Sequence, residues 1–188
     1  MEPRVGGNII FARRAFVLER GGEALWMRVL ARLPPADAAA LAKVILVISA
    51  YPLALNVRLD QAIAAELSPD HPERVFLEMG RASAEGNLRG PQRAFVREGD
   101  PHHLLESAEL IYSYYYSVGR RTYQRTGPTS GVLTTHDAAP TTPSDCLTVV
   151  AWHQRAIEIS GGSDVIVTET RCRHGGDPVC EYACSWKA

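Results

Sequence analysis

Residues 164–186 carry the strongest structural signal in the chain: two strand-like segments joined by a short turn. The first segment, DVIVTETRC, alternates in polarity and is rich in β-branched residues, and the second is VCEYACSW. Between them, RHGGDP supplies the glycines and the proline that are typical of a turn. The pattern therefore predicts an antiparallel β-hairpin, so the fold must contain a sheet.

Most of the preceding chain has the spacing of amphipathic helices. Gly21 and Gly22 form a break before one predicted helix, and Pro34 ends it. Asp100 is expected to cap another helix, which begins at Pro101 and runs through the tyrosine-rich segment to about residue 124. The apolar spacing predicts further helices over 36–49, 52–67, 74–87 and 146–159.

Short strands are predicted near residues 93–97 and 131–135, and helices precede the hairpin, so the order of elements indicates an α+β fold. We expect a layer of N-terminal helices packed on an antiparallel sheet. With 188 residues, of which 46% are hydrophobic, the chain is long enough for one sizeable core, and we expect a single domain over 1–188.

The charge balance argues against two classes of partner. The formal net charge is -1, which provides neither the basic surface typical of nucleic-acid binding nor a polybasic membrane anchor. The most apolar run, KVILVISAY, is far shorter than the roughly 20 residues that span a bilayer. We therefore expect a cytoplasmic protein with reduced thiols, in which a cysteine cluster is more often metal-binding or catalytic than disulfide-bonded.

Three cysteines and one glutamate are candidate metal ligands. The hairpin brings Cys172 and Cys180 together at its turn, and Cys146 opens a helix that can fold back to them. Glu169 would lie on the opposite face from Cys172 in a regular strand, so its use as a ligand requires a bulge or a strand end. Three thiolates and one carboxylate suit Zn(II), with His174 as an alternative to Glu169 and reduced structural thiols as the alternative to a metal.

The spacing C-x22-E-x2-C-x7-C, with its preceding Gly-Gly pair, resembles the zinc-binding 4-vinyl reductase domain over residues 144–186. That domain occurs in bacterial sensors of aromatic compounds. It is related to small trafficking-complex subunits and to the superfamily of nitric-oxide signalling and Golgi transport ligand-binding domains. The resemblance implies zinc as cofactor, held by Cys146, Glu169, Cys172 and Cys180. It also implies a dimer and an apolar cavity in the helical part.

An enzymatic role is not expected. The chain lacks the C-x-x-C element of zinc deaminases, and the GGDP sequence is not followed by the Lys-Ser/Thr of a phosphate-binding loop. A site closed by four protein ligands is structural by default. Cys184 is the one unassigned thiol, and we expect it to be a buried small side chain.

The segment YSYYYS, 112–117, allows two interpretations. Its tyrosines can pack in the core and at an oligomer interface, or they can line a site for an apolar or aromatic ligand. In the second case the lining would be Tyr112, Tyr115, Trp152 and Phe76, around a void of about 300 Å³ or more. Tyr115 would point inward, and its hydroxyl would find a partner on the ligand.

Two functions remain open on the sequence alone. The chain is either a small-molecule-binding or regulatory domain with a structural zinc site, or a dimeric scaffold that binds proteins and has no small-molecule ligand. A homodimer is predicted in both cases, built on apolar faces of the helices over 54–67 and 112–116.

Overall fold

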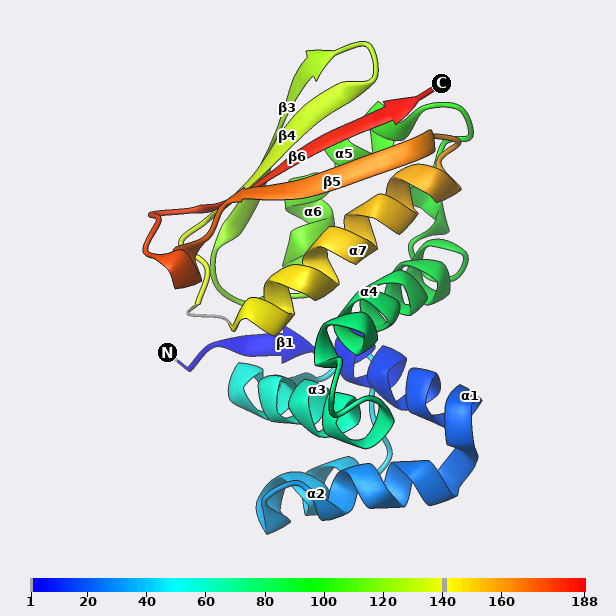
Figure 1. Ribbon diagram of the computed structural model, residues 1–188, viewed down its shortest axis with the longest axis vertical. Helices are drawn as coiled ribbons and strands as arrows, with labels where there is room; N and C mark the ends of the chain where they lie inside the picture. The colour runs from blue at the N-terminus through cyan, green and yellow to red at the C-terminus, as the bar shows by residue number, and fades with distance from the viewer. Residues whose placement is uncertain (1, 140–141) are drawn as a thin grey trace.

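The computed structural model describes residues 2–139 and 142–188. A four-stranded antiparallel sheet forms one end of the molecule, and a group of N-terminal helices forms the other (Figure 1). Two helices, α4 and α7, pack along one another between these parts. The arrangement confirms the predicted α+β fold. Within the described residues, no helix combines the length and the apolar character needed to cross a bilayer.

The sheet has the strand order β3-β4-β6-β5, and every neighbouring pair is antiparallel. Strands β5 and β6 form the hairpin that the sequence predicts, and β4 covers the strand predicted near 131–135. Helix α7 packs against β5, so the sheet has a helical layer on one face. The strands are β3 (Arg120–Gly127), β4 (Ser130–His136), β5 (Ser163–Arg171) and β6 (Cys180–Lys187), and α7 spans Pro143–Ile159.

The first helix is longer than predicted and is kinked at the expected glycines. Helix α1 runs over Gly7–Ala31, but Gly21 and Gly22 have non-helical backbone angles, with φ of 61° at Gly22. Only glycine adopts that conformation without strain, which explains why the kink falls there. Strand β1 (Arg4–Gly6) precedes α1 and pairs with β2 (Ala50–Pro52).

The predicted helix over 36–49 is wrong beyond its first half. Helix α2 spans only Pro35–Leu41, and the chain then continues as a loop up to β2. The sequence after Lys43 is rich in β-branched residues, which lose side-chain freedom in a helix, and the pairing of β2 with β1 draws the chain away. Val44 and Ile48 in this loop are 82% and 97% exposed.

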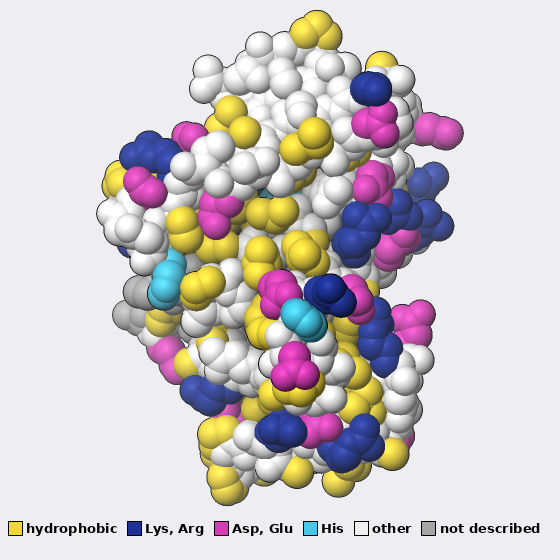
Figure 2. Space-filling model, in the orientation of Figure 1, with side chains coloured by type: hydrophobic (Ala, Val, Ile, Leu, Met, Phe, Trp, Pro, Cys, Tyr) yellow, Lys and Arg dark blue, Asp and Glu magenta, His cyan; other side chains and the backbone are white. Residues whose placement is uncertain are grey.

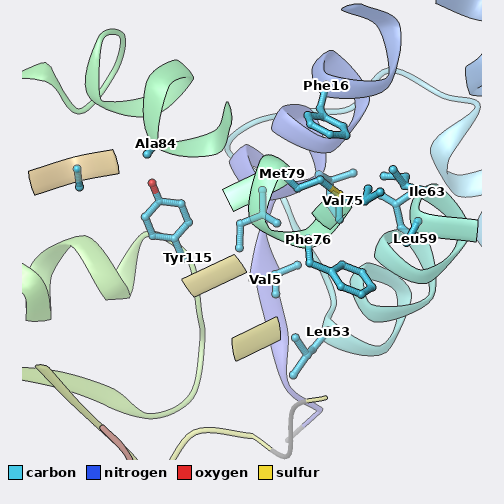
Figure 3. Close-up of a cluster of buried hydrophobic side chains, with 14 of the residues drawn as sticks. Val5, Phe16, Leu53, Leu59, Ile63, Val75, Phe76, Met79, Ala84 and Tyr115 are labelled. Carbon is cyan, nitrogen blue, oxygen red and sulfur yellow. The ribbon is translucent and has the colours of Figure 1, made fainter. Parts of the chain in front are cut away.

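Helices α3 (Leu53–Leu67) and α4 (Pro72–Leu88) match the predicted periodicity. Leu59 and Ile63 of α3 are fully buried, as is Met79 of α4 (Figure 3). Helix α4 approaches α7 closely at Gly80, where a Cβ atom would lie 2.3 Å from the carbonyl oxygen of Thr148. The small residue therefore sets the distance between the two helices.

The long helix predicted from Asp100 is three separate elements. Asp100 does cap α5, accepting a hydrogen bond of 3.2 Å from the His103 amide. However, α5 (Pro101–Glu106) is followed by α6 (Ala108–Ser113), and a turn at Gly119, with φ of 81°, leads into β3. Pairing of β3 with β4 outweighs the helical pattern of this segment. The strand predicted near 93–97 is also wrong, because Arg93–Phe95 forms a 3-10 turn, η1.

Candidate functional site: a thiol and carboxylate cluster beside a small cavity

The candidate metal ligands of the sequence converge at one end of the sheet. One side-chain ligand atom each from Cys146, Glu169, Cys172 and Cys180 lies within 4.8 Å of the other three. The Sγ atoms of Cys146 and Cys172 are 3.6 Å apart. Helix α7 supplies Cys146 from its first turn, and the β5–β6 hairpin supplies the rest. We call these four residues the thiol–carboxylate cluster.

A bulge in β5 allows Glu169 to join the cluster. Glu169 pairs with Tyr182 and Arg171 pairs with Glu181, so the register shifts by one residue between them. In a regular strand, residues three apart lie on opposite faces, and one additional residue restores them to the same face. The bulge therefore meets the geometric condition that a Glu169 ligand imposes.

The turn between the two strands is shaped around the thiols. The Cys172 amide donates to Oδ2 of Asp177 at 2.9 Å, and the Arg173 amide donates to Sγ of Cys180 at 3.4 Å. Gly176 closes the turn with φ of 99°, a conformation that favours glycine. His174, the alternative ligand, is exposed and lies outside the cluster.

The cluster is electrostatically uncompensated. Oε1 of Glu169 is buried and has no hydrogen-bond partner. Burial raises the pKa of the Cys146 thiol, and the nearby Glu169 raises it further. Burial also raises the pKa of Cys180. Buried thiols beside a carboxylate, with the pKa raised at Cys146 and Cys180, are an arrangement that a bound cation would stabilise.

A second feature lies about one to two turns further along α7. A cavity of about 50 Å³ lies where α7, α4 and α6 meet. Its wall includes three of the four residues predicted to bind a ligand, Tyr112, Tyr115 and Trp152. Phe76 is not among them, because it packs in the helical core near Leu53 and Val5 (Figure 3). We call this space the α7 cavity.

Two expectations about this cavity are wrong. Its volume is about 50 Å³ rather than 300 Å³, because buried side chains fill the interior between the helices and the sheet. The hydroxyl of Tyr115 also has a hydrogen-bond partner within the chain, since it donates to Oε1 of Gln92 at 2.8 Å. Burial raises the pKa of this hydroxyl, so it remains a neutral donor.

Sequence reasoning missed two polar residues of the cavity wall, Arg121 and His153. Arg121 donates from Nε to Oγ1 of Thr135 at 2.9 Å, and its Nη1 lies 3.3 Å from Nε2 of His153. Nδ1 of His153 lies 2.8 Å from the Val149 carbonyl oxygen, so Nδ1 carries the proton. Burial, and then the Arg121 charge, lower the pKa of His153 to about 3. The signal for Arg121 was hidden because its segment was assigned to a helix, where strand alternation could not be applied.

Comparison with known proteins identifies the fold. No family model and no curated protein matches the sequence. Among solved structures, an H-NOX protein from S. oneidensis in the Fe(II)NO state has a TM-score of 0.72 at 14% identity, covering 97% of this chain and 99% of its own. An unliganded Fe(II) H-NOX protein from K. algicida has a TM-score of 0.67 at 11% identity, covering 97% of both chains.

An oxygen-binding H-NOX domain related to soluble guanylate cyclases has a TM-score of 0.70 at 11% identity, with 97% of this chain and 95% of that chain covered. At these identities the likeness shows a shared fold, that of the H-NOX structures. The narrower resemblance to the 4-vinyl reductase domain finds no support in these comparisons.

The prediction of zinc as the cofactor is wrong by the same comparisons. The proteins that share the fold are described with iron in the Fe(II) state, and one of them in a study of haem distortion. None of these descriptions names zinc. The thiol–carboxylate cluster is a feature of this chain's own residues, and nothing in the neighbouring proteins assigns an ion to it.

Haem does not fit this chain. A haem needs a cavity of several hundred Å³ and an axial His, Cys, Met or Tyr, whereas the α7 cavity measures about 50 Å³. Both ring nitrogens of the buried His153 have partners, and so do those of His102, at 2.6 Å from the Tyr123 hydroxyl and 2.7 Å from the Pro128 carbonyl. The larger surface hollows, of about 810 and 460 Å³, are lined by no His, Cys or Met among the described residues. The second is lined by three tyrosines, of which Tyr115 is bonded to Gln92, Tyr116 stacks on Tyr112 and Tyr114 is about half exposed. The chain therefore has the fold of the H-NOX proteins, and its described residues form no cavity that fits a haem.

Proposed function

We propose that this chain is a non-enzymatic regulatory domain that binds a small molecule in the α7 cavity. One observation carries the proposal: helix α7 supplies both Cys146 of the cluster and the cavity-wall residues Trp152 and His153. A ligand that contacts the wall therefore acts on the helix that the cluster ties to the hairpin. The fold shared with H-NOX proteins described in an Fe(II)NO state and as oxygen-binding supports a role in binding a small molecule.

The thiol–carboxylate cluster is proposed to hold one thiophilic metal ion. Thiolates are soft ligands, and a ligand set closed by four protein groups leaves no position for substrate or water. Such a site is structural, which agrees with a non-enzymatic role. Its effect would be to fix the first turn of α7 against the turn of the β5–β6 hairpin, so that movements of α7 pivot about that end.

Native mass spectrometry of protein purified without chelators tests both parts of this proposal. We expect one metal ion per chain and a small molecule that is retained at low collision energy. Metal analysis identifies the ion, and Cys172→Ser should release it without releasing the small molecule. A protein that carries neither ion nor small molecule, and gains neither on incubation with cell extract, would overturn the regulatory function.

A scaffold function is the second candidate, and exposed apolar side chains favour it. Val44 and Ile48 in the loop after α2 are 82% and 97% exposed, and Phe11 and Tyr114 are about half exposed. Figure 2 shows hydrophobic side chains reaching the surface at the end of the molecule where α2 lies. The α3 face predicted to form a dimer is mostly buried within the chain, so a dimer would have to use other surfaces.

Light scattering at micromolar concentration tests the scaffold candidate. If the exposed loop forms a dimer, then Val44→Ser with Ile48→Ser should yield a monomer of unchanged fold. The matched control is Met27→Ser, at an exposed apolar position on α1, outside this loop in the sequence. A monomeric parent protein would remove the dimeric scaffold.

A further inference from the structure

We propose that the α7 cavity selects a small planar oxyanion, such as a short-chain carboxylate. The inference rests on the proposed function, because it names the chemical class of the ligand that this cavity would bind. It is carried by two donors in the cavity wall whose hydrogen-bonding capacity the protein uses only in part. One of these donors is a buried cation.

Arg121 is the first of these donors. Its side chain comes from β3 and is 8% exposed, so the guanidinium is removed from bulk water. A guanidinium has five N–H donors, and the protein acceptors of Arg121 are the Thr135 hydroxyl and the His153 ring, both of them neutral. Within residues 2–139 and 142–188, no ion pair joins Arg121 to a carboxylate.

Arg13 provides an internal comparison, because it lines the same cavity. Its Nε and Nη2 donate to the two carboxylate oxygens of Asp60 at 2.7 and 3.1 Å, and Nη1 donates to Ser83 Oγ at 2.7 Å. Arg13 is thus paired with a carboxylate. The guanidinium of Arg121 instead lies over the rings of Tyr112 and Tyr182, at 5.0 and 5.8 Å from their centroids, and has no carboxylate partner among the described residues. A full counter-charge attracts a guanidinium more strongly than a neutral ring does, so a counter-ion from outside the chain would lower the free energy of the folded state.

Besides Asp60, which pairs with Arg13, a second buried carboxylate, that of Asp145, lies in this region. It lies with Arg121 in the wall of a separate, smaller cavity of about 30 Å³, on the side of the thiol–carboxylate cluster. It does not approach Arg121 closely enough to form an ion pair. Arg121 thus lines both cavities, and beyond its contacts with Thr135 and His153 its N–H groups have no acceptor among the described residues.

Trp152 is the second donor. Its indole Nε1 is buried and makes no hydrogen bond of normal geometry, although it lies near enough to the Tyr115 hydroxyl to lower the pKa of that group, and the side chain lines the α7 cavity together with Arg121. An indole N–H can only donate, so its complement is an acceptor. One oxyanion between the two side chains would accept from both, which explains two unsatisfied groups with a single ligand.

The size of the cavity limits the anion. About 50 Å³ leaves room for only a few heavy atoms. Apolar and aromatic groups form much of the remaining wall and exclude a larger hydrated ion; these are Ile9, Ile111, Tyr112, Tyr115 and Val149. Formate, acetate and nitrate have the charge, shape and size that this wall admits.

Calorimetric titration with acetate and acetamide tests the proposal, because the two probes match in shape and differ in charge. We expect saturable binding of acetate and at least tenfold weaker binding of acetamide, since hydrogen bonds to a charged acceptor are stronger than those to a neutral one. Arg121→Gln should abolish acetate binding, and Trp152→Phe should weaken it several-fold. Arg120→Gln, at the exposed neighbouring position of β3, should bind acetate like the parent protein.

The outcomes separate this inference from the proposed function. Equal binding of acetate and acetamide would overturn the preference for anions and leave a small-molecule cavity standing. Absence of binding by formate, acetate and nitrate, while native mass spectrometry retains a neutral molecule, would do the same. If no probe binds and no molecule is retained, both proposals fail.

Circular dichroism of Arg121→Gln shows whether lost binding reflects the lost cation or a lost fold. Trp152→Phe tests the site without removing charge.

Discussion

The Sγ atoms of Cys146 and Cys172 lie 3.6 Å apart and join the first turn of α7 to the end of β5. No covalent link holds this contact, because all four cysteines are free. The packing of α7 on β5 brings the two thiols together, and the hairpin turn adds Cys180. Ionisation of the thiols, or a cation bound between them, would therefore change the strength of this contact.

Replacement of a cluster cysteine should destabilise the chain strongly. If an ion is bound, Cys180→Ser removes one ligand, and metal binding is coupled to folding by several kcal/mol in such sites. Chemical denaturation measures the loss, and a chelator should lower the melting temperature of the parent but not of the variant. Cys184→Ala is the matched control, because Cys184 is buried on the same strand outside the cluster; this variant keeps all four ligands, so the chelator should lower its melting temperature as it does that of the parent. A parent protein that is unaffected by the chelator would contradict the metal proposal.

Acid should destabilise the fold through His153. The pKa of this buried ring is about 3, below its ordinary value of 6.5, so the unfolded chain binds the proton more readily. The stabilisation is complete above pH 6.5 and is lost as the pH falls toward 3, by up to about 1.4 kcal/mol per pH unit. Urea denaturation between pH 4 and 7.5 measures the slope. His153→Gln should have a smaller slope than the parent, and equal slopes would show that His153 is not the group responsible.

Removal of one partner of the buried pair between Arg13 and Asp60 should cost about 3–5 kcal/mol, because it leaves an unpaired charge in the core. Asp60→Asn keeps the shape of the side chain and removes its charge. The matched control is Glu23→Gln, which removes the exposed partner of Arg14 and should change the free energy of unfolding by less than about 1 kcal/mol. Similar losses in the two variants would mean that burial does not set the strength of the Arg13 pair.

Alanine at two glycines of α4 should have opposite effects. Gly80→Ala places a Cβ atom against the Thr148 carbonyl, which forces α4 and α7 apart and should cost about 1–3 kcal/mol. Gly86→Ala meets no atom within 4 Å and should stabilise the helix by about 0.5–1 kcal/mol. Thermal denaturation of both variants is the measurement. A stabilising Gly80→Ala would contradict the close packing of these helices.

Local sequence patterns predicted the elements whose stability depends on neighbours along the chain. Asp100 caps α5 because its carboxylate reaches an amide three residues ahead. The kink at Gly22 follows from the conformational freedom of glycine. The β5–β6 hairpin follows from the alternation of β-branched residues around a glycine-rich turn. These features require no knowledge of the rest of the fold.

Long-range pairing decided the elements that the sequence mispredicted. Arg121 lies in a segment whose apolar spacing suits a helix, and it becomes part of a strand because β4 offers a partner edge. The loop around Val44 fails to continue α2 because β2 pairs with β1.

In the candidate site, too, the sequence predicted one part and the packing of separate elements decided the other. The spacing of Cys146, Glu169, Cys172 and Cys180 was visible in the sequence, because three of the four belong to one hairpin. The α7 cavity was not foreseen in its true form, since Arg121 and Trp152 reach it from different elements. The volume of a cavity and the satisfaction of the polar groups around it depend on how separate elements pack, and no local pattern in the sequence encodes that packing.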